Sequence, residues 1–554
     1  MIRRVAVALL VLLALSALAG CAGSSGAKGA AEKVIRYNMA ADPRSLDPAV
    51  MTDLTAFSAE NQMCEGMVRI GEKGPEPALA SQWEVSADGL TYTFHLRPGL
   101  KWSNGDPLTA DDFLFAWRRA LDPRFGSEYA YQLYYIKNGK TINELAPTSY
   151  KDPVSKKDPI YDDKAVDAAL QTLGARAPDP NTVIVTLETP TPYFLGLTAF
   201  PTLHPVDKKV VQANPQWADK PETYVCSGPF MLQSWAHNDK LEMVRNPYYW
   251  GKADVKVDRL VYLMVESGAT ALSQWETDAV DIIDSPPNAE LDRLRQEGKL
   301  QSAPSFGTYY YIFNDSKPPF DNPKVRRALS LAIDRKAIVQ NVTRGGQLPA
   351  YALVPSGSPD AAPGSDFRQV GGDLFHEDLA EAKRLLAEAG YPEGKGFPEI
   401  PLIYNTSEGH KAVAEAIAQM WKSGLGITVT PQNIEWKVVL DKRAHKDYLL
   451  ARAGWFGDYL DPMTFMDLYV TGGGNNDTAY SNPKVDQLID LAKHTGDQAT
   501  RLRNMHQAEQ TLVGDDMAVL PIYYYVNLYL QKPNIHGVFR NALGIMDLTH
   551  ASVD

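Results

Sequence analysis

Residues 400–429 read IPLIYNTSEGHKAVAEAIAQMWKSGLGITV. The apolar run over 400–404 predicts a buried strand, and apolar residues at helical spacing over 410–422 predict a helix that faces a core. A second apolar run at 427–429 predicts another strand. A strand, a helix and a strand in this order form a parallel pair with a right-handed crossover. The stretch therefore predicts an α/β body, in which ligands favour the carboxyl ends of the strands, close to His410.

Three further stretches carry helix or strand signals. Apolar residues at helical spacing over 325–333 and over 378–389 predict two helices. Over 90–96, apolar and polar residues alternate as in a strand with one buried face. Thr109, followed three residues later by Asp112, is typical of a helix N-cap with an acidic residue in the first turn. Helices and strands are therefore expected along the whole chain.

Length and charge set limits on the class of protein. With 554 residues, 44% of them hydrophobic and 22% charged, the chain is long enough for several globular bodies. Its formal net charge of -12, with no run of basic residues, argues against a nucleic-acid partner. The 27 Tyr and 10 Trp suit either a binding surface or large mixed cores.

The amino terminus has the features of an export signal. Two arginines precede an apolar run over 5–19, which is too short for a comfortable membrane span. The run ends in Leu-Ala-Gly-Cys at Cys21, which looks like the lipobox of bacterial lipoproteins. We expect residues 1–20 to be a lipoprotein signal peptide, Cys21 to be acylated and residues 21–33 to be a flexible tether. The alternative is an ordinary signal peptide followed by a chance cysteine.

Two cysteines remain in the body of the chain. Cys64 and Cys226 would lie in an oxidising compartment, so a disulfide between them is possible. Their separation in the sequence decides nothing, and we favour two buried thiols.

Motifs for catalysis are absent from the sequence. The chain contains no H-E-x-x-H, C-x-x-C or G-x-S-x-G pattern, and its histidines have no metal-ligand spacing. We therefore expect a protein that is not an enzyme and that uses neither a cofactor nor a bound metal.

A carboxylate among aromatic residues marks the strongest candidate site. Residues 451–467 read ARAGWFGDYLDPMTFMD, which places Asp458 in an apolar and aromatic setting. Leaving such a charge buried and unpaired costs on the order of several kcal/mol. Asp458 should therefore have a partner, which is either Arg452 or a bound ligand.

Several motifs, in order along the chain, resemble those of one known family. The family is the family 5 extracellular solute-binding proteins, and the resemblance is to its oligopeptide-binding branch. The matching motifs are W-x-x-x-x-D-G-L-T-Y-T-F-H-L-R from Trp83, K-W-S-N-G from Lys101, T-A-D-D-F from Thr109, S-G-P-F from Ser227, R-N-P-Y-Y-W from Arg245, V-R-R-A from Val325, A-I-D-R from Ala332 and Y-Y-Y-V-N from Tyr523.

This resemblance implies a three-lobed, periplasmic-binding-protein-like α/β fold, with two α/β lobes around a hinge and an extra lobe. Lobe I would be discontinuous and combine residues 34–64, 209–305 and 527–554. Lobe II would comprise residues 65–208, and lobe III residues 306–526.

The resemblance also implies a function. The chain would be an extracytoplasmic, lipid-anchored monomer that captures short peptides between two lobes and delivers them to an ABC importer. The permease and ATPase subunits of that importer would be separate chains. The same scaffold could instead bind a dipeptide, a cell-wall peptide, a peptide signal or a metal chelate. A secreted peptidase is the alternative from another class, and the missing catalytic motifs argue against it.

Specific ligand contacts follow from matching the family's positions. Asp458 would bind the peptide's α-ammonium group, and Arg443, Arg452 and His410 would bind its carboxylate, because guanidinium groups suit carboxylates. His410 would need a raised pKa or a hydrogen-bonding role. The expected backbone partners and pocket wall are Gly454, Trp455, Phe456, Trp436, Tyr129, Tyr525 and Leu54. The competing interpretation is that the cations are solvated surface charges and that the aromatics are core residues.

The sequence also departs from the family pattern. Thr52 replaces an acidic residue after S-L-D-P, and Asp284-Ser285 replaces a Tyr-Asn pair. Gly307 and Phe456 stand where some relatives carry a cysteine pair, so we expect that bridge to be absent. Side-chain preference should therefore differ from that of the well-known members.

Overall fold

The computed structural model describes residues 32–72, 74–152 and 157–554. The predicted signal peptide, Cys21 and all but the last two residues of the predicted tether lie outside the described residues. In the part that is described, no helix is both long and apolar enough to cross a membrane.

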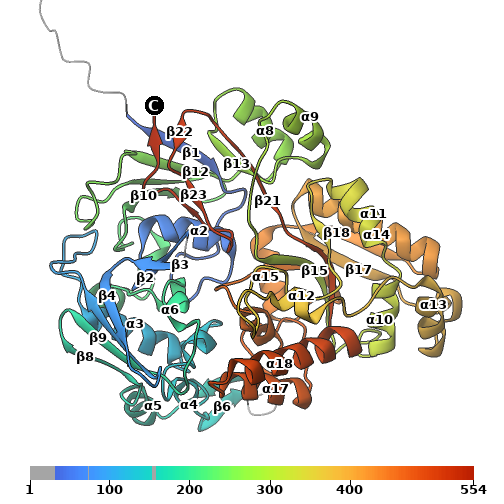
Figure 1. Cartoon of the computed structure of the whole chain (residues 1–554), viewed down its shortest axis with the longest axis horizontal. Helices are drawn as coiled ribbons and strands as arrows, with labels where there is room; N and C mark the ends of the chain where they lie inside the picture. Colours follow the sequence, from blue (N-terminus) through green and yellow to red (C-terminus); the bar gives the residue numbers. More distant parts are fainter. Residues whose placement is uncertain (1–31, 73, 153–156) are drawn as a thin grey trace, which may run out of the picture. The chain divides into compact units, whose positions relative to one another are not determined.

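The first of three main sheets draws its strands from distant parts of the chain (Figure 1). Its seven strands run in the order β10-β11-β12-β1-β13-β21-β14, and β1 is parallel to both of its neighbours. The helix α2 (Leu54–Met63) packs on this sheet, and we call the body the seven-stranded lobe. Its strands are β1 (Val34–Asn38), β10 (Phe230–Ala236), β11 (Lys240–Arg245), β12 (Arg259–Leu263), β13 (Ile282–Asp284), β14 (Gln301–Ala303) and β21 (Asn527–Gln531).

The second sheet is antiparallel, with strands in the order β4-β5-β9-β8. Helix α3 (Ala110–Leu121) packs on it, and its predicted capping box is confirmed by the 2.8 Å hydrogen bond from Thr109 N to Asp112 Oδ2. The short 3-10 helix η1 (Ala130–Leu133) contacts α3 and completes what we call the four-stranded lobe. Its strands are β4 (Ala80–Val85), β5 (Thr91–Leu96), β8 (Ala175–Asp179) and β9 (Thr182–Thr186).

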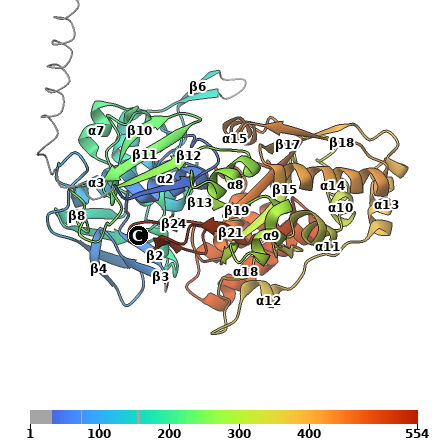
Figure 2. The same ribbon diagram turned by 90° about the horizontal axis from the view of Figure 1, so that it is seen from above.

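The third sheet contains the predicted strand, helix and strand unit. Its order is β16-β20-β15-β19-β17-β18, and β17 and β18 are parallel. Helix α14 (Glu408–Leu425) connects them and packs on both, as predicted (Figure 2). We call this body the six-stranded lobe. Its strands are β15 (Gly307–Phe313), β16 (Leu348–Pro349), β17 (Ile400–Asn405), β18 (Val429–Ile434), β19 (Leu450–Phe456) and β20 (Val519–Tyr524).

One strand boundary was predicted wrongly. The sequence placed a strand at 427–429, whereas β18 begins at Val429 and continues through polar residues to Ile434. The reason is that β18 is the edge strand of its sheet, so most of its side chains face solvent and give no apolar run. The other two predicted helices are confirmed as α10 (Pro323–Leu331) and α13 (Leu379–Glu388).

Strand β19 has a free edge that matters for the site. On one side it pairs with β15 along its whole length, from Gly307 opposite Phe456 to Phe313 opposite Leu450. On the other side, its pairing with β17 is confined to Leu450 and Ala451. The backbone from Arg452 to Phe456 is therefore free to accept another strand on the β17 side.

The expectation of two buried thiols is wrong, because Cys64 and Cys226 form a disulfide with a Cα–Cα distance of 5.1 Å. Cys64 ends α2, and Cys226 precedes β10, the strand on which α2 packs. Gly228 lets the two segments approach, since its N–H donates to Met63 O at 2.6 Å and a Cβ there would lie 2.6 Å from the same oxygen. Packing within one lobe brings together cysteines that lie 162 residues apart.

Candidate functional site

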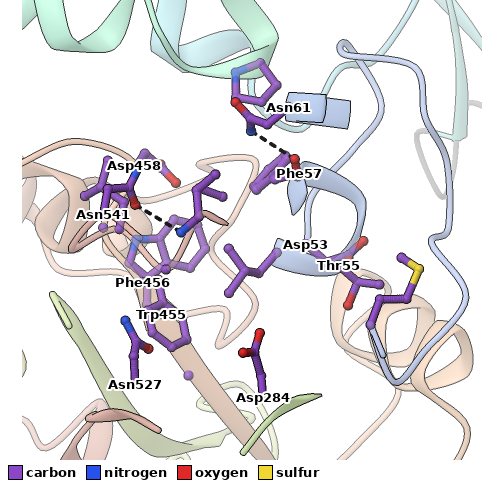
Figure 3. A pocket seen from close by; sticks show the side chains of 18 of the residues that line it. Asp53, Thr55, Phe57, Asn61, Asp284, Trp455, Phe456, Asp458, Asn527 and Asn541 are labelled. Atoms are coloured by element: carbon purple, nitrogen blue, oxygen red, sulfur yellow. Dashed lines mark hydrogen bonds between the residues drawn. The ribbon is translucent and has the colours of Figure 1, made fainter. Parts of the chain in front are cut away.

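A cavity of about 450 Å³ is lined by residues of all three lobes. Volumes of this size are typical of small-ligand sites. All of the residues that the sequence analysis assigned to the site lie in its wall: Leu54, Tyr129, His410, Trp436, Arg443, Arg452, Gly454, Trp455, Phe456, Asp458 and Tyr525. In Figure 3, Asp458, Trp455 and Phe456 gather on one side, and Asp53, Thr55 and Phe57 approach from another. Their contacts with a ligand stay a prediction.

Asp458 lies two residues beyond the end of β19 and is only 9% exposed. Gln132 Nε2 donates to its Oδ2 at 2.7 Å, and Tyr129 Oη lies at a long 3.5 Å from its Oδ1. Burial raises the pKa of the Asp458 carboxyl well above its ordinary value, and the nearby Asp467 adds to that rise. Among the described residues, no lysine or arginine forms an ion pair with Asp458.

Arg452 is engaged elsewhere, so the hypothesis that it pairs with Asp458 is wrong. Its Nη1 donates to Asn405 Oδ1 at 3.2 Å and its Nη2 to Tyr525 Oη at 2.6 Å. The guanidinium also lies 4.8 Å from the centre of the Tyr309 ring, a cation–π distance. All of these partners are neutral, which leaves the positive charge of Arg452 available to an anionic ligand group.

Arg443 is not a solvated surface charge, because its side chain is only 11% exposed. Its Nη2 lies 2.7 Å from Asp477 Oδ2, and its Nε donates to the same oxygen at 2.9 Å. The charge of Arg443 is therefore already compensated within the six-stranded lobe.

Of the two roles that the sequence analysis left open for His410, the structure favours a hydrogen-bonding role over a raised pKa. Burial, together with the positive charge of Arg452, lowers the pKa of the His410 imidazole well below its ordinary value. The ring lies 5.5 Å from the Tyr309 ring and close to the carboxyl end of β17, as expected. His410 can serve this site as a hydrogen-bonding group but not as a charge.

Gly454 is required by the packing of a neighbouring tyrosine side chain. A Cβ at this position would lie 2.3 Å from Tyr525 Oη, the hydroxyl that accepts a bond from Arg452. The glycine therefore makes room for the protein's own tyrosine rather than only for a ligand. Tyr525 in turn stacks on Phe456 with ring centres 4.5 Å apart.

Aromatic residues of the wall also join the lobes. Tyr129 of the four-stranded lobe stacks on Trp455 of β19 with ring centres 6.2 Å apart. The Nε1 of Trp436, which begins α15 (Trp436–Ala444), donates to Asp53 Oδ1 at 3.4 Å, next to α2. These aromatic residues are thus in the cavity wall and in contacts between lobes at the same time.

Sequence reasoning missed two features of the site. Gln132 gave no signal, because a buried glutamine is recognisable only once the fold shows what it bonds. Asp284 was noted as a departure from the family, but its two partners were not predicted. Arg540 Nη1 lies 2.8 Å from Asp284 Oδ1, and Tyr37 Oη donates to Asp284 Oδ2 at 2.6 Å.

Comparison with known proteins defines the class to which this fold and cavity belong. Residues 74–477 match the family profile described as bacterial extracellular solute-binding proteins, family 5 Middle, and the chain belongs to this family. It is 36% identical over 527 residues to the dipeptide-binding protein DppE of Bacillus subtilis, covering 94% of this chain and 92% of that one. The predicted α/β fold with several lobes is confirmed.

Two solved structures show which arrangement of lobes is present here. Haemophilus influenzae OppA in complex with RPPGFSPFR superposes with a TM-score of 0.84, at 32% identity over 94% of this chain and 99% of that one. The unliganded open form of the murein tripeptide-binding protein MppA gives a TM-score of 0.59, at 31% identity over 95% and 98%. The two sequence identities are almost equal, so the lower TM-score of the open form reflects a different arrangement of its lobes. The contacts between lobes described above are therefore those of a closed form.

Proposed function

We propose that the chain is an extracytoplasmic receptor that encloses a short peptide between its lobes and delivers it to an ABC importer. One observation carries this proposal: along β19 and just beyond its end, the cavity offers an arginine whose partners are neutral, a free strand edge and a buried carboxylate that no described lysine or arginine pairs with. A peptide presents the complementary groups, which are an ammonium, a backbone with strand-like hydrogen-bonding capacity and a carboxylate.

Peptide length follows from the spacing of the two charged ends. Arg452 and Asp458 are six residues apart on and just beyond β19, which corresponds to about 20 Å of extended chain. The reach of the arginine side chain into the cavity shortens that span, so a ligand of about three to five residues fits between the two groups.

The wider setting belongs to the same proposal. Acylation of Cys21 would anchor the receptor to the cell membrane, and the 21–33 tether would give it reach. It would act as a monomer and present its closed, loaded form to separate permease and ATPase subunits. The relatives are named as binding proteins for dipeptides, oligopeptides or a murein tripeptide, which supports a peptide ligand without fixing its length.

Native mass spectrometry of the purified receptor tests the proposal directly. We expect co-purified masses that fragment as short peptides, and we expect added peptides to be recovered intact after incubation. Peptide masses would decide between a dipeptide, an oligopeptide and a cell-wall peptide. A co-purified metal chelate, or hydrolysis of added peptide above the buffer control, would overturn the peptide-receptor proposal.

A further inference from the structure

The carboxylate of Asp458 is held by a residue from a different lobe. Gln132 lies in η1 of the four-stranded lobe, whereas Asp458 follows β19 of the six-stranded lobe. The glutamine side chain is fully buried and lies behind Asp458 rather than in the cavity wall. Its Nε2–H donates to Asp458 Oδ2, so this 2.7 Å bond can exist only while the two lobes are together.

We propose that Gln132 is a positioning residue that couples recognition of the ligand's ammonium group to closure of the lobes. This inference rests on the proposed function, because it assumes that Asp458 receives the ammonium. Gln132 itself touches no ligand. It fixes one oxygen of Asp458 and leaves the other facing the ligand.

The electrostatics of closure support this coupling. In separated lobes, water hydrates the Asp458 carboxylate, and closure removes that water. Gln132 then supplies one donor to Oδ2, Tyr129 makes a long contact to Oδ1, and the Thr464 hydroxyl gives the carboxyl group one further hydrogen bond. Closing without a cation therefore buries a charge that is only partly compensated, and an ammonium at Oδ1 removes the penalty. The amide bond is also stronger to an ionised carboxylate than to a protonated one, so the ammonium strengthens the link between lobes.

Other contacts between the same two lobes do not involve Asp458. Tyr193 stacks on Tyr459 with ring centres 4.8 Å apart, and Tyr135 Oη donates to Asp467 Oδ2 at 3.0 Å. Asn475 Nδ2 lies 3.1 Å from Tyr131 Oη. These contacts stabilise closure whatever the ligand carries at its amino terminus. The Gln132 bond is where the ligand's ammonium group can influence closure.

The experiment compares Gln132→Met with Asn475→Ala. Methionine keeps the volume of the glutamine but removes its donor, whereas Asn475→Ala removes a bond between the same lobes that does not reach Asp458. For Gln132→Met, we expect the dissociation constant of a tripeptide with a free amino group to rise tenfold or more. The constant for the N-acetylated tripeptide should change less than twofold. For Asn475→Ala, both constants should change by the same factor.

Equal losses for the two peptides in Gln132→Met, or no loss at all, would overturn the coupling. If wild-type protein binds no peptide, the proposed function fails instead, so the two failures are distinguishable. Thermal unfolding confirms that the variant is folded.

A second measurement needs no variant. Small-angle X-ray scattering of the wild type should show the most open form with no ligand, and a larger compact fraction with saturating free tripeptide than with saturating N-acetylated tripeptide. The same compaction with both peptides would overturn the proposal.

Discussion

The two ends of the cavity are built in different ways. The Asp458 end is shared between lobes, since Gln132 and Tyr129 come from the four-stranded lobe. The Arg452 end is built within the six-stranded lobe, where Asn405 and Tyr525 hold the guanidinium. One end is completed only by closure, and the other is present before closure.

This difference suggests that the site recognises the two ends of a peptide with different strictness. The Asp458 carboxylate has its geometry fixed across the lobes by Gln132, so the position of the amino terminus should be strict. At the other end, Arg452 has neutral partners, the charge of Arg443 is matched by Asp477, and His410 is neutral. The carboxyl terminus should therefore be recognised less strictly, and peptides of different lengths should be tolerated.

The largest expected effect is that of Asp458→Asn. Losing a hydrogen bond to a charged partner costs about 1.5–3 kcal/mol, so affinity for peptides with a free amino group should fall roughly tenfold to a hundredfold. N-acetylated peptides should bind the variant and the wild type almost equally. Isothermal titration calorimetry on both peptides provides the measurement, and equal losses would contradict the ammonium assignment.

The next largest effect should be the loss of peptide affinity as the pH is lowered. The ammonium binds the ionised form of Asp458, whose pKa burial raises well above its ordinary value. Affinity for free peptides should therefore rise with pH until Asp458 is fully ionised, by up to about tenfold per pH unit, and binding should release a proton. Calorimetry in buffers of different ionisation enthalpy measures that proton. In Asp458→Asn this dependence should vanish, and a pH-independent affinity in the wild type would refute the prediction.

A smaller loss is expected for Arg452→Met, which removes the charge from the less strict end. Affinity for peptides with a free carboxylate should fall about threefold to tenfold, because water can replace part of the interaction. Amidated peptides should be nearly unaffected, and Arg452→Lys should retain part of the affinity by keeping the charge. A loss larger than that of Asp458→Asn would reverse the proposed difference between the two ends.

The smallest effect is expected for Gly454→Ala. The added Cβ would meet Tyr525 Oη at 2.3 Å, so the tyrosine must shift and Arg452 would lose its 2.6 Å bond. We expect a loss of about twofold to fivefold for free peptides, measured by the same titration. In a Tyr525→Phe background, where the hydroxyl is absent, Gly454→Ala should have little further effect. If the affinity losses of Gly454→Ala and Tyr525→Phe add up in the double variant, Gly454 matters chiefly for contact with the ligand.

Local patterns predicted the parts of the fold that depend on neighbours in sequence. The apolar spacing over 400–422 and the Thr109–Asp112 capping box are such cases, and both are confirmed. The family resemblance also implied eleven residues that line the cavity. The charge state of His410 was beyond that reasoning, because it depends on the proximity of Arg452 and on burial among residues from other strands.

The sequence by itself determined the α/β class and the family, because helical periodicity, capping and ordered motifs are local properties of the chain, and the family resemblance implied part of the cavity wall. The Cys64–Cys226 disulfide, the partners of Arg452 and the bond from Gln132 to Asp458 were decided only by the tertiary structure. Each of these joins residues more than forty positions apart along the chain, as the 47, 73, 162 and 326 residue separations show. Their pairing follows from how the lobes pack, which no local pattern encodes.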